Sequence, residues 1–352
     1  IDLGLELGLL RNRITVELDL YQKVTSDLLL FASIPPSSGF SQIYKNVGKV
    51  QNKGLELTVN TTNIQTKNFN WTTSFNISFN RNKLLQLAEG QEAIGRSTGF
   101  SNTLFSQANA YIAKIGQPLG LMYGLVFDGV YQYSDFDQPS PGTYVIKSNV
   151  AGNGASRAAI RPGDVKYRDI NGDGTINTFD YTVIGRSLPI HIGGFNNNFT
   201  YKNFDLNIFF QWSYGNDIQN LNKAAFMGGI TGVNQYEDYK NRWTPTNPST
   251  TIPRATGFAS AFAGYSSYSI EDGSFLRFKT MALGYTVPAS VLKLWKIQSI
   301  RAYGSAQNLF TWTKYSGQDP EVNLLNNVLT GGLDFSSYPK ARTITFGLDI
   351  TF

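Results

Sequence analysis

Apolar and polar residues alternate along many segments of the chain, which is the pattern of β-strands with one apolar and one polar face. In residues 69–80 the alternate positions carry large apolar side chains, namely Phe69, Trp71, Phe75, Ile77 and Phe79. The positions between them carry amide and hydroxyl side chains. Residues 204–214 and 342–352 follow the same rule. The pattern therefore predicts strands whose two faces meet different surroundings, one apolar and one wet.

The same alternation predicts about nine strands, most of them close to the ~9–11 residues with which a tilted strand crosses a bilayer. The segments are residues 2–9, 14–24, 54–63, 69–80, 190–201, 204–214, 274–286, 299–313 and 342–352. Residues 274–286 and 299–313 alternate poorly, so we expect bulges or protein-covered faces there.

Very short and very long connections alternate between these strands. The short ones are "RNR" (11–13), "QTKN" (65–68) and "YKN" (201–203), and the long ones lie near residues 26–50, 83–188, 215–269 and 316–341. All short connections fall at one end of the predicted strands and all long ones at the other. This asymmetry is typical of outer-membrane barrels, which have short periplasmic turns and long external loops. Within the 215–269 connection, "NLNKAAF" predicts a short helix.

A transmembrane barrel explains both the alternation and the loop asymmetry. Inside hydrocarbon every backbone N–H and C=O must be paired, which only helices and closed barrels achieve. The sequence has no run of ~18 apolar residues that predicts a spanning helix. Trp71 and Trp212 lie near strand ends, where aromatic girdles belong. A soluble sandwich is the alternative, and it requires a second layer against the apolar face.

Composition narrows the possible classes further. Aromatic and glycine residues are abundant (19 Tyr, 24 Phe and 34 Gly), which favours β-structure. Cysteine is absent, which excludes disulfide scaffolds, zinc fingers and thiol catalysis. The net charge of +5 is spread without a Lys/Arg run, so no nucleic-acid partner is expected. The chain starts at Ile1 inside an alternating segment, and nine strands alone leave two bare edges, so we expect a piece of a larger barrel.

Five stretches resemble the SusC-like (RagA-type) family of TonB-dependent outer-membrane transporters, and they follow the family's order over nearly the whole chain. They are "NVGKVQNKGLEL" (46–57), "GDVKYRDINGDGTIN" (163–177), "YKNFDLNIFFQWSYGNDIQN" (201–220), "IEDGSFLRFKTMALGYTVP" (270–288) and "AQNLFTWTKYSGQDPEV" (306–322). The final strand, which ends at Phe352, resembles the terminal assembly signal of such barrels.

The resemblance implies an all-β fold, a transmembrane antiparallel β-barrel with long extracellular loops. Residues 1–352 would be the C-terminal portion, about nine strands of a plugged barrel of about 22 strands. Residues 83–188 and 215–269 would be large extracellular loop insertions, and the plug domain and early strands would be absent from this chain.

The family's function is likewise an implication of the resemblance. Members import glycan fragments or peptides across the bacterial outer membrane, with a SusD-like surface lipoprotein as a lid and with energy from the TonB complex. The TonB contact would lie in the missing N-terminal part, and outer-membrane lipid would surround the barrel. The resemblance does not separate an oligosaccharide from a peptide substrate.

One motif, "DINGDGTINTFD", fits the template of a calcium-binding loop. Its candidate ligands are Asp169, Asn171, Asp173, Thr175 through its carbonyl, Asn177 and Asp180. Gly174 permits the sharp turn, and Asp180 stands where a longer Glu is usual. The other interpretation is a turn built from residues that favour turns. We expect a structural Ca²⁺ site in an external loop.

No catalytic site is expected. The only histidine, His191, has no nucleophile motif beside it and is interpreted as a strand residue near the barrel rim. Glu17 and Asp19 share a face, and we expect them to pair with Lys or Arg on neighbouring strands. Aromatic residues of the long connections could grip cargo or pack loop against loop, namely Tyr111, Tyr123, Tyr131, Tyr133, Trp243 and Tyr265.

Three functions therefore stand at this point. The leading one is TonB-dependent import of a nutrient oligomer. The first alternative is a passive porin or structural outer-membrane barrel, against which the long connections and the family stretches argue. The second is a secreted calcium-binding adhesive β-domain, which "DINGDGTINTFD" alone suggests.

Overall fold

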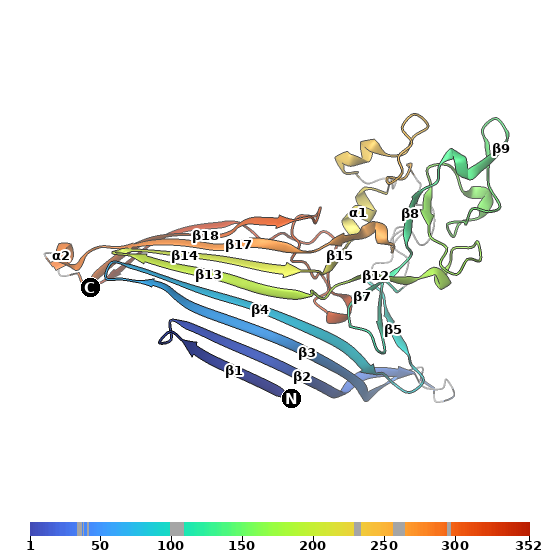
Figure 1. Cartoon of the computed structure of the whole chain (residues 1–352). Helices are drawn as coiled ribbons and strands as arrows, with labels where there is room; N and C mark the ends of the chain where they lie inside the picture. The colour runs from blue at the N-terminus through green and yellow to red at the C-terminus, as the bar shows by residue number, and fades with distance from the viewer. Residues whose placement is uncertain are drawn as a thin grey trace.

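Nine antiparallel strands form the main sheet of the molecule, called the wall below. The computed structural model describes residues 1–33, 37, 39–40, 42–98, 109–228, 234–255, 265–293 and 297–352. The strand order in the wall is β1-β2-β3-β4-β13-β14-β17-β18-β20, so neighbours in sequence are neighbours in space (Figure 1). The strands are β1 (Asp2–Leu9), β2 (Ile14–Ser33), β3 (Gln42–Gln65), β4 (Phe69–Gln86), β13 (His191–Tyr201), β14 (Phe204–Tyr214), β17 (Phe275–Thr286), β18 (Ser299–Thr313) and β20 (Thr343–Thr351).

The predicted strands are confirmed, and one predicted connection is wrong. Every predicted segment overlaps one strand of the wall. The expected polar connection near 26–50 is largely strand, because β2 and β3 stay paired from Leu28↔Gly48 to Ser33↔Gln42. A register shift between Thr25 and Leu28 absorbs the break in alternation there. Residues 34–36, 38 and 41 of the connection lie outside the described part of the chain.

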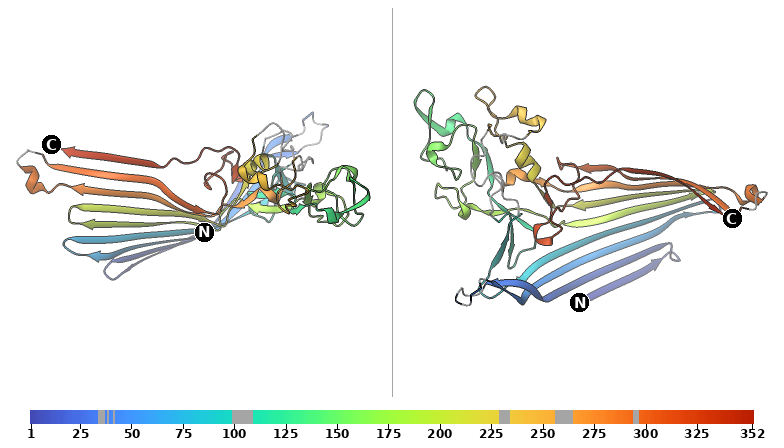
Figure 2. Two further views of the ribbon diagram at one scale, coloured as in Figure 1. Left: turned by 90° about the horizontal axis from the view of Figure 1, so that it is seen from above. Right: turned by 180° about the vertical axis from the view of Figure 1, so that it is seen from behind.

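The wall is a single curved layer in both further views (Figure 2). Phenylalanines from five neighbouring strands stand directly opposite one another along its apolar face, in the order Phe75, Phe195, Phe210, Phe278 and Phe310. The rings of Phe210 and Phe278 stack with centroids 4.8 Å apart. Their row runs across the strands, as cross-strand pairing requires.

The apolar face has no protein cover in the described part of the chain. Phe346 is 83% exposed and Ile344 62%, and none of the buried apolar clusters contains a residue of 69–79 or 204–214. A sandwich would bury these side chains under a second sheet. The single exposed layer therefore rules out the sandwich alternative for these strands.

The connections sort by length as predicted. The turns after β1, β3 and β13, the connection with helix α2 (Ala289–Leu292) and the C-terminus lie at one end, called the short-turn end (Figure 1). The long connections gather at the other end, called the long-connection end. No helix in the described residues is long and apolar enough to cross a membrane.

Segments 87–190, 215–274 and 314–342 form the loop assembly at the long-connection end. Their described residues contain four small sheets and the short helix predicted at "NLNKAAF", α1 (Leu221–Phe226). The strands are β5 (Ala93–Arg96), β6 (Tyr111–Lys114), β7 (Leu121–Gly124), β8 (Phe127–Val130), β9 (Phe136–Ser140), β10 (Thr143–Ile146), β11 (Val165–Tyr167), β12 (Thr182–Arg186), β15 (Asp217–Asn220), β16 (Ile270–Asp272) and β19 (Leu333–Asp334). Five buried clusters hold these pieces together.

Candidate functional site

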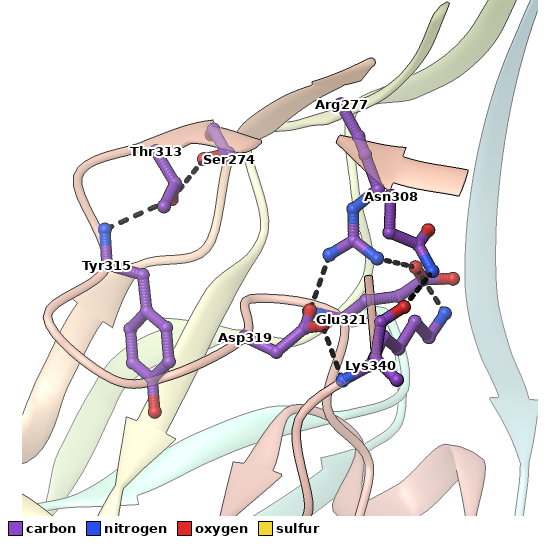
Figure 3. A network of polar contacts seen from close by, with 9 residues as sticks. Ser274, Arg277, Asn308, Thr313, Tyr315, Asp319, Glu321 and Lys340 are labelled. Carbon is purple, nitrogen blue, oxygen red and sulfur yellow. Dashed lines mark hydrogen bonds and ion pairs between the residues drawn. The ribbon is translucent and has the colours of Figure 1, made fainter. Parts of the chain in front are cut away.

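A group of four charged residues, of which Arg277 and Asp319 are buried, ties the 314–342 segment to the polar face of the wall (Figure 3). Arg277 on β17 donates from Nη2 to Asp319 Oδ1 at 2.5 Å and from Nη1 to Glu321 Oε2 at 3.2 Å. Lys340 pairs with Glu321 through its ammonium group, and its backbone N–H donates to Asp319 Oδ2 at 3.2 Å. These four residues are called the Arg277 cluster.

The Arg277 cluster holds both ends of the segment at once. Asp319 and Glu321 lie near its start, Lys340 lies near its end, and Asn308 of β18 donates to the carbonyl of Ala341 at 2.9 Å. The Arg277 side chain is only 1% exposed. An unpaired charge at that depth costs several kcal/mol. If the segment left the wall, the Arg277 guanidinium would lose both carboxylate partners and would be either exposed to water or buried without a counter-charge.

A bulge in the wall lies next to Arg277. The pairing of β17 with β18 shifts between Phe278 and Thr280, and Asn308 on the opposite strand has a positive φ of 53°. Bulges re-aim neighbouring side chains and often lie near functional sites. The bulges expected in 274–286 and 299–313 are thus confirmed, and the covered face is the one carrying Arg277.

Hydrogen bonds lower the pKa of the Asp319 carboxyl. Burial alone would raise the pKa of its carboxyl. Hydrogen bonds from the Glu321 N–H and from Arg277 outweigh burial and hold the pKa of Asp319 below its ordinary value. The carboxylate is therefore ionised at neutral pH, as the pairing with Arg277 requires.

A cavity of about 660 Å³, called the Gln211 cavity, lies between the polar face and residues 320–323 of the tied segment. Its lining combines neutral polar side chains with a larger apolar surface, which includes the rings of Phe209, Trp212 and Phe275. Its lining residues include Asn76, Phe209, Gln211, Phe275, Glu321 and Asn323. Glu321 belongs to the Arg277 cluster, so the cluster fixes one edge of the cavity.

A larger cavity of about 1100 Å³, called the Tyr236 cavity, lies within the loop assembly. It is acidic, because four carboxylates line it against one ammonium group, namely Glu237, Asp238, Glu271, Asp334 and Lys223. Burial would raise the pKa of Glu271, but the Ser316 N–H and hydroxyl and the Lys223 ammonium outweigh it and lower that pKa. The two cavities thus differ in charge while lying in neighbouring parts of one end of the molecule.

Comparison with known proteins supplies the family. The profile described as "TonB dependent receptor-like, beta-barrel" matches residues 1–123. TonB-dependent receptor P3 of Formosa agariphila is 37% identical over 358 residues, which cover 100% of this chain and 34% of that protein. The RagAB peptide transporter structure is 26% identical with a TM-score of 0.75 and covers 100% of this chain and 35% of that one.

The chain belongs to the SusC/RagA family of TonB-dependent receptors. TonB-dependent receptor SusC of Bacteroides thetaiotaomicron is 29% identical over 99% of this chain and 31% of that protein. The chain therefore spans about a third of the length of the curated relatives it matches. Members of the SusC/RagA family are outer-membrane β-barrel proteins, so the wall is a piece of such a barrel.

In a SusC/RagA barrel the apolar face meets lipid and the polar face lines the lumen. The Arg277 cluster and the Gln211 cavity are then lumenal, at the long-connection end. Sequence reasoning did not find either of them. The stretch "SGQDPEV" carries Asp319 and Glu321, and its sequence alone indicates only the resemblance to the family.

The predicted calcium loop lies within the 83–188 connection and away from the wall strands. Its side chains mostly bond to the loop's own backbone: Asp169 accepts from Gly172 and Gly174, and buried Asp180 accepts from Ile170 and Asn177. In the described residues no three His, Cys, Asp or Glu side chains gather to hold a metal. Each carboxylate oxygen keeps a further lone pair, so calcium binding stays a prediction.

Two other sequence expectations have different outcomes. His191 begins β13, where it stacks on Tyr214 and accepts from Trp212 Nε1 at 3.1 Å, so the rim interpretation is confirmed. The expected pairing of Glu17 and Asp19 with Lys or Arg is wrong for the described residues. Their cross-strand neighbours are other acidic, glycine or hydroxyl residues, which offer no cation.

The aromatic residues of the long connections divide by burial. Tyr111, Tyr131 and Tyr265 are fully buried and Trp243 is 6% exposed, so these four pack the loop assembly. Tyr133 is 41% exposed and lies against the Trp243 ring. Tyr123 is half-buried against Tyr181. Most of these aromatics therefore serve loop packing.

Proposed function

We propose that the protein containing this chain imports a nutrient oligomer, a glycan fragment or a peptide, across the bacterial outer membrane. Transport would be TonB-dependent and would use a SusD-like surface lipoprotein. The observation that carries the proposal is an uncovered apolar face opposite a polar face that borders one cavity, with a second cavity in the loop assembly at the same end. Catalysis has no part in it, in keeping with a family of receptors and transporters.

The orientation follows from loop length. Barrels of the outer membrane keep short turns in the periplasm and long loops outside. We therefore place the loop assembly, which includes most of 83–188 and 215–269, on the extracellular side. Both cavities then open where cargo arrives and where a lipoprotein lid would lie.

Names of relatives support the partner and cargo classes. One structural match is titled as the RagAB peptide transporter and another as the RagAB peptide importer in an open state. SusC of Bacteroides thetaiotaomicron matches nearly the whole chain. The names of the two RagAB structures support a peptide as one of the two proposed cargo classes.

Uptake measurements separate import from a passive pore. Cells that carry the intact protein should accumulate labelled oligomer, and removing TonB or collapsing the proton gradient should abolish accumulation. Uptake that is unchanged by both treatments would favour the porin alternative. Purification in detergent followed by native mass spectrometry should show a co-purifying lipoprotein.

The adhesive alternative predicts a water-soluble protein. The intact protein should instead partition into the detergent phase on Triton X-114 separation, because the apolar face needs a hydrocarbon surround. Recovery in the aqueous phase would contradict the import proposal.

We propose, separately, that the Asp169–Asp180 loop holds a structural calcium ion. Calcium would draw together oxygens that now point to different N–H groups, and so would stiffen the loop. Proteolysis of the 164–185 region should be slower with calcium than with chelator. Equal proteolysis rates with calcium and with chelator would contradict calcium binding by this loop.

A further inference from the structure

Three cationic side chains lie together on the apolar side of the wall, towards the long-connection end. Lys53 of β3 lies directly opposite Arg81 of β4, and Lys83 is the next residue of β4 on the same face. They alternate in step with Leu55 and Phe79, so they point to the side that meets lipid. All three side chains are exposed. These three residues are called the Arg81 patch.

The Arg81 patch begins where the apolar band of the wall ends. Phe79, His191 and Tyr214 form an aromatic row there, with the His191 ring centroid 5.3 Å from that of Phe79 and 5.0 Å from that of Tyr214. Aromatic rows in barrels mark the boundary between hydrocarbon and headgroups. From Trp71 to Arg81 strand β4 rises ~33 Å, which at a tilt of about 40° is ~25 Å of height, the height of the apolar band. The patch therefore lies at the depth of the lipid headgroups.

The Arg81 patch has no anionic partner in the described part of the chain. None of its three cations forms an ion pair there. The cross-strand neighbour of Lys53 on β2 is Gln22, and that of Lys83 on β3 is Gln51. Like charges directly opposite one another, as Lys53 and Arg81 are, destabilise a sheet. An anion bound between them would remove this repulsion.

The Arg81 guanidinium is already fixed in position for such an anion. Its Nη1 donates to the carbonyl of Ile190 at 2.9 Å and to the carbonyl of Asn80 at 3.2 Å. Its Nε and Nη2 donate to no described residue. A guanidinium edge with two free donors matches two oxygens of a phosphate, and a lysine ammonium adds a mobile positive charge. One fixed guanidinium and two lysines thus suit a single phosphate group.

We propose that the Arg81 patch binds the phosphate group of a lipid in the outer leaflet, such as lipid A. Arg81, Lys53 and Lys83 hold the phosphate, and the acyl chains lie along the apolar face that continues from Leu55 and Phe79. This continuity favours a lipid over free phosphate. The choice of leaflet rests on the orientation proposed above, whereas the binding itself is independent of cargo and of import.

Lipid exchange on the intact transporter in detergent tests the proposal. Delipidated protein is mixed with lipid A or with lipid A whose phosphate has been removed by phosphatase, each with and without excess inorganic phosphate. Native mass spectrometry counts the lipids retained. We expect lipid A to bind about tenfold or more tightly than the dephosphorylated lipid, and inorganic phosphate to displace little of it. Equal retention of the two lipids would overturn the inference, and so would full displacement by inorganic phosphate.

Variants without the cations locate the bound lipid. Arg81→Gln should weaken lipid A binding about tenfold, the worth of a charge-assisted hydrogen bond. The triple variant K53Q/R81Q/K83Q should lose the preference for the phosphorylated lipid. Lys23→Gln is the matched control, because Lys23 lies on β2 at the same height but on the polar face. Unchanged binding in the triple variant, or equal weakening by Lys23→Gln and Arg81→Gln, would overturn the inference.

The same preparations separate lipid binding from its competitors. Loss of a co-purifying protein from the triple variant, with lipid A binding unchanged, would assign the Arg81 patch to a protein partner and overturn the inference. Loss of TonB dependence in the unaltered protein would overturn the import proposal, while the phosphate preference of the lipid site would stand. Heat-modifiable migration on gels checks that each variant is folded.

Discussion

The wall and the loop assembly differ in the exposure of their large apolar side chains. Along the wall, large apolar residues such as Phe346 and Leu3 remain more than 60% exposed, and they sit on one face only. In the loop assembly, Tyr111, Met122 and Leu221 are fully buried in a common cluster. This difference indicates that the apolar side chains of the two regions have different surroundings. The loop assembly buries its apolar groups from water, and the wall offers its own to hydrocarbon.

The Arg277 cluster joins these two regions, so breaking it should have the largest effect. Arg277→Met leaves the buried Asp319 carboxylate without a cation and leaves Glu321 with Lys340 alone, and it should cost about 3–5 kcal/mol of stability. Cleavage of the 314–342 segment by protease should rise together with this loss. In the double variant R277M/D319N, which keeps the pair of Glu321 with Lys340 and leaves no unpaired charge in the cluster, much of the stability should return. Unchanged cleavage in Arg277→Met would mean that the cluster does not hold the segment.

Removing a leucine from each region sharpens the comparison directly. Leu221→Ala opens a cavity in the loop assembly and should cost about 2–5 kcal/mol. Leu5→Ala removes the same atoms from a half-exposed position on the apolar face of the wall and should cost much less. Urea unfolding of both variants in detergent measures the difference. Similar losses would imply that the apolar face is buried by protein.

Adding a charge tests the two faces of the wall. Phe195→Arg places a cation in the row of phenylalanines and should cost about 2–4 kcal/mol near the bilayer midplane. Gln307→Arg, on the exposed polar face, should be close to neutral. Unfolding from lipid vesicles is the measurement. A neutral Phe195→Arg would contradict lipid contact at that row.

Acid should loosen the junction between the regions without unfolding the wall. Because the folded pKa of Asp319 lies below its ordinary value of about 3.9, its contribution is present above that value and is lost as pH falls through the lowered pKa. Protease cleavage within 314–342 should therefore rise below about pH 4. In Asp319→Asn the cleavage should be high at every pH and show little dependence on it.

The strands of the wall were predictable because a period of two is visible in sequence whenever the faces meet different solvents. Residues 26–50 were misjudged because Asp27 and the neighbouring bulge interrupt that period while pairing continues. The Arg277 cluster could not be predicted from spacing. Its partners lie 42 and 44 residues away, and only the path of the 314–342 segment brings them together.

Candidate ligand contacts were the least predictable feature. Aromatic residues of the long connections were natural candidates, yet Tyr111, Tyr131 and Tyr265 fill loop cores. The amides of Asn76 and Gln211 were visible only as members of the polar alternation. Their position in the lining of the Gln211 cavity depends on Gly194 between them and on the tied segment opposite, which are properties of the folded sheet.

Spin labels along β14 test the solvent assignment most directly. Single cysteines at positions 205 to 212 of the intact protein in lipid vesicles would carry the label. Residues 1–352 contain no cysteine, and any cysteine elsewhere in the intact protein is replaced by serine. Collision with oxygen, which dissolves in lipid, should peak at Leu206, Ile208 and Phe210, and collision with a water-soluble nickel complex should peak at Asp205, Asn207 and Gln211. Low oxygen accessibility at Leu206, Ile208 and Phe210 would contradict lipid contact, and the barrel account would fall with it.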